Sequence, residues 1–312
     1  MKDTKWENTC NQVLRIMPVK IKSALRQAIG NNEHIKEIVL RANKPVCVYT
    51  FNDMFYLTYN GCLTSASDSQ PLMITSISDI TECFNMACGY SVYSHMNEIK
   101  EGFITISGGH RAGICGTAVA QSGEIANIRD ISSVSIRICR EVVGCGKDVV
   151  SLISKSSEGL IICGVPCSGK TTVLRDVARL LSFCEGRRVS LIDSRGELAS
   201  VYKGVPQLDA GLCDVLDSYP RAQGIIQALK VLSPEFILCD EISSEEDCNA
   251  ILSGLNSGVR FVTTSHAGGY EEFLKKPFAK ELLSTGAFEY IVFLKGREIP
   301  GCIDKIVELK KV

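Results

Sequence analysis

The 312-residue sequence predicts an α/β protein, in which a smaller mixed α+β domain, residues 1–145, precedes a larger domain, residues 146–312. Three observations support this prediction. Short β-like runs and helical runs mix without a regular order in the first part. In the second part, apolar strands and amphipathic helices alternate regularly, as in α/β folds. Between them lies Gly144-Cys145-Gly146, which we interpret as an interdomain hinge.

In the first domain, Val19–Ile29 has apolar residues at helical spacing, and Gly30 follows as a stop signal. Ser78 to about Ser94 shows the same spacing and predicts a second helix. Phe103–Ser107 and Ala112–Ala120 are predicted to form a hairpin. Further strands are predicted at Glu37–Arg41, Val46–Thr50, Phe55–Tyr59, Ile125–Arg129 and Ser133–Arg140.

The second domain begins with a short predicted helix, Asp148–Ser154. Two final strands, Glu289–Lys295 and Cys302–Leu309, are predicted to pair antiparallel around Pro300-Gly301. Between these ends, apolar strands are predicted at Gly159–Cys163, Val189–Ile192, Phe236–Cys239 and Arg260–Thr264. The amphipathic helices that alternate with them are predicted at Thr171–Phe183, Ala222–Leu232 and Cys248–Leu255.

Composition excludes several classes of protein. Hydrophobic residues make up 45% and charged residues 22%, which is atypical of a disordered, charge-driven chain. The balance of 34 basic against 35 acidic residues disfavours a strongly basic nucleic-acid binder. The first ten residues lack the apolar segment of a signal peptide, and no apolar run reaches the roughly 18–20 residues that span a bilayer. We therefore expect a cytoplasmic protein that reaches a membrane only through partners.

Fifteen cysteines would be typical of a disulfide scaffold, but their number is odd and no CxxC pair occurs. This argues against a zinc ribbon or a thioredoxin-like site. Several cysteines lie inside apolar runs, as Cys163 and Cys239 do. We therefore expect cysteine to serve as a small buried hydrophobic residue in a reducing compartment.

The strongest functional signal is a complete GxxxxGK[ST] pattern that follows an apolar strand and opens a helix. Such a turn exposes backbone N–H groups to phosphate oxygens, and the helix adds the positive end of its dipole. Lys170 is expected to reach the β- and γ-phosphates, and the Thr171 hydroxyl to bind Mg²⁺. We expect the nucleotide to be bound by Gly164, Val165, Pro166, Cys167, Ser168, Gly169, Lys170, Thr171 and Thr172.

A second signal is the apolar strand Phe236–Cys239, which ends in Asp240 and Glu241. Carboxylates at the carboxyl end of a strand lie where open α/β sheets bind ligands. Asp240 is expected to hold Mg²⁺ through water, and Glu241 to polarise the attacking water. A solvated strand end is the alternative interpretation.

Two weaker signals follow other apolar strands. Asp193 ends one strand, and Glu197 lies four residues further on. These acids are candidates for a metal ligand or a base, but capping of a helix by Asp193 or Ser194 is equally compatible with the pattern. Thr264-Ser265-His266 ends another strand, and any of the three is a candidate sensor of the γ-phosphate. A lone histidine such as His266 is, however, more often structural.

A hydrolytic phosphate site usually needs an arginine that stabilises charge. No arginine of the second domain stands out in this role. Arg111, Arg129, Arg137 and Arg140 lie on or beside the strands before the hinge. We therefore take Arg137 as a candidate catalytic residue donated by the first domain. A solvated face is the ordinary explanation of such a group, and an arginine from a neighbouring subunit is a further possibility.

Taken in order, these motifs resemble the ATPases of the type II/type IV secretion and pilus-motor superfamily. GVPCSGKTT resembles the Walker A loop, LIDSRGEL the acidic Asp box, FILCDEI the Walker B segment and TTSHAG the His box. The resemblance implies a RecA-like P-loop ATPase core behind a mixed N-terminal domain. It also implies ATP and Mg²⁺ as cofactors, assembly into a homo-hexamer, and catalytic roles for Glu197, Glu241 and His266.

The closer resemblance is to a sporulation branch of this superfamily, carried by ISGGHRAGICGTAV, NIRDISSVSIRICRE, PRAQGIIQALKVLSPEFILCDEI and FEYIVFLKGREIPG. It implies a mother-cell ATPase whose partners are integral membrane proteins of a channel complex leading to the forespore. Two departures concern arginine. Many members carry Gly-Glu-Ile-Arg at Walker B, where this chain has Asp240-Glu241-Ile242-Ser243. In addition, Lys230 stands where an arginine is expected.

Three other functions are alternatives to an ATPase motor. A nucleotide-gated scaffold would bind ATP with little turnover, and the intact acids Glu197, Asp240 and Glu241 disfavour it. A P-loop small-molecule kinase would need an arginine-rich lid, which the sequence lacks, and would leave the first domain unexplained. Nucleic-acid binding is disfavoured by the charge balance and by the lack of a basic and aromatic stripe.

Overall fold

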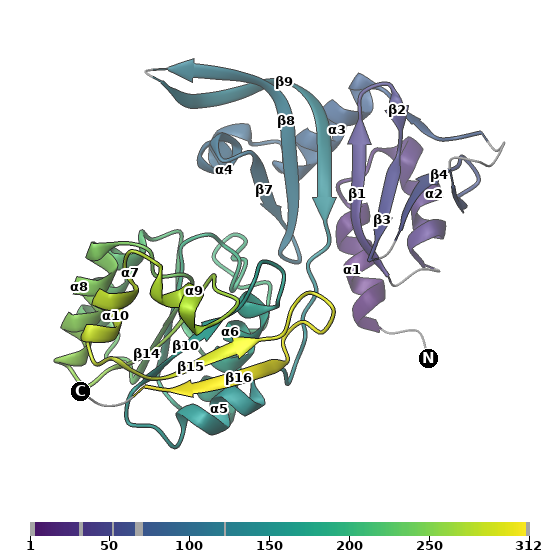
Figure 1. Cartoon of the computed structure of the whole chain (residues 1–312). Coiled ribbons are helices and arrows are strands. Elements are labelled where there is room, and N and C mark those ends of the chain that lie inside the picture. Colours follow the sequence, from purple (N-terminus) through teal and green to yellow (C-terminus); the bar gives the residue numbers. More distant parts are fainter. Residues whose placement is uncertain (1–3, 31–33, 52, 66–70, 122, 310–312) are drawn as a thin grey trace. The chain divides into compact units, whose positions relative to one another are not determined.

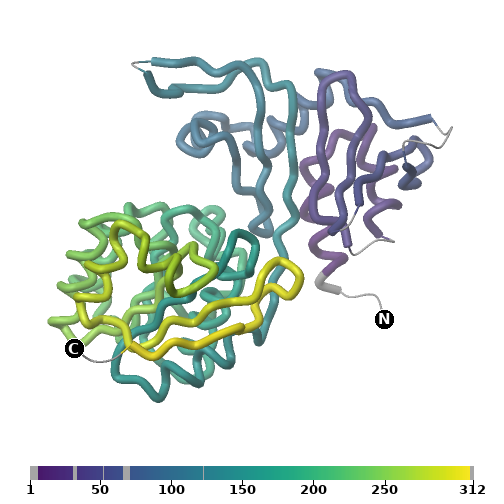
Figure 2. The backbone as a smooth tube through the Cα atoms, viewed as in Figure 1, coloured from purple at the N-terminus to yellow at the C-terminus, as the bar shows by residue number. Residues whose placement is uncertain are grey.

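The computed structural model describes residues 4–30, 34–51, 53–65, 71–121 and 123–309. The chain divides into two compact units, Met1–Arg140 and Glu141–Val312, each with its own sheet and core (Figure 1). The tube in Figure 2 shows that the backbone of each unit folds back on itself many times. None of the helices in the described ranges is long and apolar enough to cross a membrane.

The first unit is built on a seven-stranded antiparallel sheet. Its strands are β1 (Ile35–Arg41), β3 (Cys47–Thr50), β4 (Met54–Leu57), β5 (Leu63–Thr64), β7 (Phe103–Ile106), β8 (His110–Gln121) and β9 (Glu124–Arg137). Their order in the sheet is β5-β4-β3-β1-β9-β8-β7. A separate two-stranded sheet pairs β2 (Lys44–Pro45) with β6 (Ile74–Thr75).

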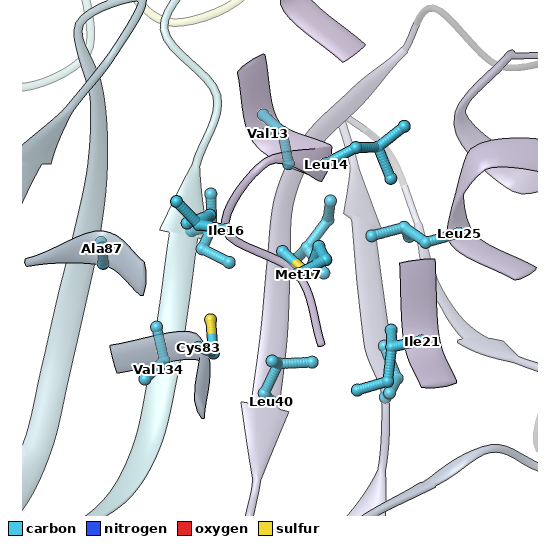
Figure 3. Packing of buried hydrophobic residues seen from close by; sticks show 14 of the residues in the cluster. Val13, Leu14, Ile16, Met17, Ile21, Leu25, Leu40, Cys83, Ala87 and Val134 are labelled. Carbon is cyan, nitrogen blue, oxygen red and sulfur yellow. The ribbon is translucent and has the colours of Figure 1, made fainter. Parts of the chain in front are cut away.

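Helices supply the rest of this core. They are α1 (Thr4–Leu14), α2 (Val19–Gly30), α3 (Ile77–Ala87) and the short α4 (Met96–Lys100), which a 3₁₀ turn at Val92–His95 precedes. The Ser76 side chain and Asp79 form a reciprocal capping box that fixes the start of α3. Figure 3 shows apolar side chains of the α1–α2 region, of α3 and of the strands packed together. The ones it labels include Val13, Leu14, Met17, Ile21, Leu25, Leu40, Cys83 and Val134.

The predicted strands of this unit are present, with one main difference. Ile125–Arg129 and Ser133–Arg140 were predicted as separate runs, but a single strand, β9, covers the first run and the second as far as Arg137. Asp130 adopts a left-handed conformation with φ 49°, and the pairing shifts between Cys115 and Thr117 opposite it, so a bulge replaces the predicted break. Helix α1 was not predicted, because it contains few apolar residues, although Trp6, Cys10, Val13 and Leu14 recur at helical spacing.

The second unit contains a seven-stranded sheet in the order β12-β11-β13-β14-β10-β15-β16. The strands are β10 (Gly159–Cys163), β11 (Val189–Asp193), β12 (Asp214–Asp217), β13 (Phe236–Cys239), β14 (Arg260–Ser265), β15 (Phe288–Leu294) and β16 (Ile303–Glu308). All neighbouring pairs are parallel except β15 and β16, which pair antiparallel as predicted. Strand β10 lies between β14 and β15 and is buried along its whole length.

Helices cover both faces of this sheet. They are α5 (Lys147–Ile153), α6 (Lys170–Arg179), α7 (Arg221–Val231), α8 (Glu245–Leu255), α9 (Tyr270–Leu274) and α10 (Ala279–Ser284). Leu160 and Ile162 of β10 pack into one cluster with α5 and α6, whereas Ile161 and Cys163 pack into another with α7–α10. This alternation is the two-residue period of a strand buried on both faces. The helix predicted for Thr171–Phe183 ends at Arg179, and a π-helical turn, Leu180–Cys184, follows it.

The cysteines only partly follow the prediction that they are buried. All fifteen are free thiols. Cys163 and Cys239 are buried in strands, and burial raises the pKa of each thiol to about 12, which keeps it protonated. Others are exposed at Cys62, Cys115, Cys167, Cys184 and Cys302. Burial in apolar strands therefore explains one group of these cysteines and leaves the exposed ones without a packing role.

The position of β10 makes Gly159 intolerant of a side chain. A Cβ atom at this position would lie 2.2 Å from the carbonyl oxygen of Phe261 and 2.8 Å from that of Ala287. Both are backbone atoms of neighbouring strands or their flanks and have little room to move. We expect Gly159→Ala to lower the free energy of unfolding by about 1–3 kcal/mol, measured by urea unfolding followed by circular dichroism.

The matched control is Gly269→Ala, because a Cβ there has no heavy atom within 4 Å and the backbone is already extended. Equal urea midpoints for the two variants would contradict the proposed crowding at β10.

Candidate functional site

The predicted site residues of the second unit lie where parallel strands end at one edge of the sheet. Strand β10 leads into the glycine-rich loop, residues 164–171, and β13 ends just before Asp240. Strand β14 is followed by His266, and β11 ends in Asp193. The backbone N–H of Gly164 donates to the Ser265 carbonyl at 3.2 Å, which ties the loop to the end of β14. The sheet therefore gathers side chains that are far apart in the sequence.

The glycine-rich loop owes its shape to a few backbone positions. Gly169 has φ +91° and begins helix α6, and Cys167 also lies in the left-handed region with φ +66°. A Cβ at Gly164 would meet the Ser168 hydroxyl at 2.3 Å, so only glycine fits there. Ser168 is fully buried and its hydroxyl has no hydrogen-bond partner within the structure. The loop is thus a tight turn at a helix N-terminus, a geometry suited to anions.

Lys170 is almost fully buried, at 7% exposure. Its ammonium donates to the carbonyl oxygens of Gly164 at 3.0 Å and Val165 at 3.3 Å. Burial lowers the pKa of Lys170, while the negative charges of Asp240 and Glu241 act in the opposite direction. The glycine-rich loop therefore encloses the positive charge of Lys170, which interacts with the negative charges of Asp240 and Glu241.

His266 connects this lysine to one of the acids. The Lys170 Nζ atom lies 3.0 Å from His266 Nδ1, and His266 Nε2 lies 3.5 Å from Glu241 Oε2. Because an ammonium has only donors, His266 Nδ1 must accept, and the proton of the neutral imidazole is then on Nε2, facing the carboxylate. Three residues singled out in the sequence, Lys170, His266 and Glu241, thus form a continuous polar chain.

Asp240 is buried beside this chain and is held by strand β14. The Thr264 hydroxyl donates to Asp240 Oδ1 at 2.6 Å. Thr264 is one of the candidate phosphate sensors, and in this structure its hydroxyl binds Asp240. Thr171 and Thr172 lie in the first turn of α6, each half-buried.

Asp193 and Glu197 are placed differently from each other. The buried Asp193 carboxylate accepts three backbone N–H groups, from Glu197 at 2.8 Å, Leu198 at 3.1 Å and Ala199 at 2.8 Å. Within the described residues, no helix begins after β11 at this point, so the predicted helix cap is wrong, and the carboxylate instead caps backbone N–H groups of the loop that carries Glu197. Arg175 of α6 donates to the Glu197 carbonyl at 2.8 Å from the other side. The segment that carries Glu197 is therefore fixed by two buried charged residues.

Arg137 lies in the first unit, near the end of β9. Its side chain is exposed, and its backbone pairs in register with Arg111 of β8 and Glu37 of β1. The other predicted site residues all belong to the second unit. A role for Arg137 stays a prediction.

Besides Arg175, sequence reasoning missed two arginines that help to hold the segments around the site. Arg221, at the start of α7, donates to Asp247 Oδ2 at 3.0 Å, and the same oxygen accepts the Ser243 N–H at 3.1 Å. This pair fixes the segment after Glu241. Arg297, between β15 and β16, donates to the Pro166 carbonyl at 3.2 Å. Neither contact has a sequence signal, because both join segments whose proximity depends on strand order.

Comparisons with known proteins concern the chain as a whole. The model of a family described as sporulation stage III, protein AA, matches residues 7–312. Stage III sporulation protein AA of Bacillus subtilis (strain 168) is 32% identical over 305 residues, which are 96% of this chain and 95% of that protein. The uncharacterized protein ycf45 of Cyanidium caldarium is 29% identical over 172 residues, covering 54% of this chain and 50% of that protein.

Solved structures show the same fold. The ATPase DotB of Legionella pneumophila matches with a TM-score of 0.55 and 17% identity, over 86% of this chain and 74% of that chain. The pilus retraction motor PilT, solved with bound ADP, matches with a TM-score of 0.55 and 17% identity, over 88% of this chain and 78% of that chain. The predicted fold class, a RecA-like core preceded by a mixed α+β domain, is confirmed, as is the resemblance to secretion ATPases.

The cap at Asp193 makes a testable contribution to stability. Asp193→Ala would leave three backbone N–H groups without an acceptor, two of them on buried residues. We expect a loss of about 1–3 kcal/mol in the free energy of unfolding, measured by urea unfolding. Glu197→Gln is the control, since it keeps the N–H that Asp193 binds and should cost much less. A loss for Glu197→Gln as large as that for Asp193→Ala would refute the cap.

Proposed function

The chain belongs to the sporulation stage III protein AA family, and from this premise we propose that it is an ATP-hydrolysing motor of the secretion type. The observation that supports the proposal most is the chain of contacts from Lys170 through His266 to Glu241 beside the glycine-rich loop. This arrangement supports the proposal, because it holds a cation, a histidine and an acid beside the loop that is expected to bind the phosphates. The reaction we propose is ATP plus water to ADP plus phosphate.

Nucleotide binding is the first step. The backbone N–H groups of the glycine-rich loop and the first turn of α6 would surround the phosphates, as the loop's tight turn at a helix N-terminus favours. Lys170 would exchange its contacts with the Gly164 and Val165 carbonyls for contacts with the β- and γ-phosphates. Thr172, one residue after the loop, would add its N–H group. The desolvated ammonium interacts more strongly with phosphate than an exposed one, because little water screens it.

Hydrolysis would depend on the acids at the same edge. Glu241 would orient the attacking water and accept its proton, as a carboxylate beside a phosphate site can. His266, which lies between Lys170 and Glu241, would contact the γ-phosphate and report its loss to Glu241. Glu197, held in place by Asp193 and Arg175, would supply a second acid. Positioning and electrostatics would provide most of the catalysis.

The donor set at the site fits Mg²⁺. Thr171 offers a hydroxyl oxygen, and Asp240 offers a carboxylate that Thr264 holds in one orientation. Hard oxygen ligands of this kind, completed by substrate phosphates and water, are typical of magnesium in nucleotide sites. When bound, Mg²⁺ would neutralise charge on the β- and γ-phosphates.

The proposal extends to assembly. Residues 1–145 would form the N-terminal domain and residues 146–312 the ATPase domain of a homo-hexameric ring. The ring would work in the mother-cell cytoplasm and reach the membrane through integral membrane proteins of a sporulation channel complex, without nucleic acid as a partner. Arg137 remains our candidate for an arginine donated by the N-terminal domain. A nucleotide-gated scaffold with little turnover is the alternative for the same site.

A substitution at Glu241 distinguishes these two functions. We expect Glu241→Gln to keep ATP binding within about threefold, because the side chain keeps its size, but to lower kcat by about 10²–10⁴-fold. Lys170→Ala should instead abolish measurable ATP binding. Steady-state phosphate release and fluorescent-nucleotide titration measure the two quantities.

Glu246→Gln is the control for the loss of one nearby negative charge, because Glu246 is exposed on α8 and contacts none of the loops described above. Wild-type protein that binds ATP without measurable turnover would favour the scaffold over the motor.

Ring assembly provides a second test of the motor. We expect ATP and Mg²⁺ to shift the protein from small species to a hexamer, and turnover per subunit to rise with the hexamer fraction. Light scattering after size-exclusion chromatography and a parallel ATPase assay measure both over a concentration series. A monomer with full activity at every concentration would contradict the ring.

A further inference from the structure

The connection between β15 and β16 lies against the glycine-rich loop. The N–H of Lys295 donates to the Cys302 carbonyl at 2.8 Å, which closes this connection into a compact hairpin loop, residues 295–302. Within it, the Gly301 N–H donates to the Ser168 carbonyl at 2.7 Å. A Cβ on Gly169 would lie only 2.8 Å from the nitrogen of Gly301, so the two backbones touch. The hairpin loop is therefore fixed to the glycine-rich loop by backbone contacts that do not depend on its side chains.

Arg297 of this hairpin loop reaches the glycine-rich loop through its side chain. Its Nε atom donates to the Pro166 carbonyl at 3.2 Å. The carbonyls of the two preceding residues, Gly164 and Val165, are the ones that accept from Lys170. Two cationic side chains thus bind three consecutive carbonyls of one tight turn. Lys170 lies inside the turn and is buried, whereas Arg297 lies at its exposed rim.

The way Arg297 is held leaves its charge available. A guanidinium has five N–H donors, and the contact through Nε occupies only one of them. The Nη1 and Nη2 groups form a planar fork that matches two phosphate oxygens. The bond from Nε to Pro166 already restricts the conformations of the Arg297 side chain. The side chain therefore loses less conformational freedom when its Nη groups bind phosphate.

We propose that Arg297 binds the terminal phosphates of ATP through its Nη groups and stabilises the charge that develops there during hydrolysis. This inference rests on the proposed function and assigns to the chain's own C-terminal hairpin an arginine that the sequence led us to seek in the first domain. The location follows from the turn that Arg297 shares with Lys170: the two side chains bind neighbouring carbonyls of the glycine-rich loop, and a lysine of this loop reaches the β- and γ-phosphates. An arginine in such a position typically contributes orders of magnitude to kcat.

The substitution Arg297→Gln separates phosphate binding from a purely structural role. The Nε2 amide of glutamine stands at the same distance from the backbone as Nε of arginine, so the bond to Pro166 can be kept. The charged fork is lost. We expect Arg297→Gln to weaken ATP binding at least fivefold and to lower kcat by about 10–10³-fold, with an unchanged thermal unfolding midpoint in nucleotide-free buffer. Arg297→Lys should recover part of the ATP affinity, because it restores the charge without the fork.

Glu298→Gln is the matched control, since it alters the neighbouring exposed charge in the same hairpin loop. If Arg297→Gln binds and hydrolyses ATP within twofold of wild type while Glu241→Gln loses turnover, the role of Arg297 is refuted and the proposed function stands. If the wild type binds ATP without hydrolysing it, the proposed function fails, and titration with ATP still decides whether Arg297 binds phosphate. A wild type that binds no ATP overturns both.

Discussion

The buried ammonium of Lys170 is the constraint on which the rest of the candidate site depends. A cation taken out of water has to be solvated by the protein, or its charge is lost. Here two loop carbonyls and a histidine nitrogen do so. Each of these acceptors has to be brought to the same point, which requires the glycine-rich loop to turn tightly and β14 to end beside β10. The left-handed Gly169 and the parallel pairing of β10 with β14 meet those two requirements.

Most strands of the second unit were predictable because a strand buried on both faces reads as an unbroken apolar run. Gly159–Cys163 and Phe236–Cys239 were predicted with the bounds that the structure has. Asp240, which directly follows such a run, was predictable for the same reason, whereas Lys170 was predicted from the GxxxxGK[ST] pattern. Helix α1 was missed because its apolar residues are few, although they recur at helical spacing, and strand β12 because it is short and begins and ends in aspartate.

What the sequence did not provide is the neighbour of each strand. Strand β10 is followed in the chain by β11, yet it pairs with β14 and β15. Contacts that depend on this order, such as His266 with Lys170 or Arg297 with Pro166, join residues 96 and 131 positions apart. Periodicity describes one segment at a time and carries no information on such pairs. The end of a predicted strand and the resemblance to secretion ATPases both indicated His266, but neither indicated Arg297.

The polar residues around the site divide into those that hold the backbone and those whose charge points toward the proposed phosphates. The Asp193 carboxylate and the Arg175 guanidinium bind backbone groups of the segment that carries Glu197. The Asp247 carboxylate binds the backbone N–H of Ser243. All three side chains are buried. Lys170, His266 and Glu241 contact one another through side-chain atoms, and His266 is 41% exposed. Removing the carboxylate of Asp193 or Asp247 would leave backbone N–H groups without their acceptor, whereas in our proposal Lys170 and His266 exchange their contacts for contacts with substrate. The side chains that we expect to exchange their contacts for substrate therefore lie at the edge of the sheet where β10, β13 and β14 end.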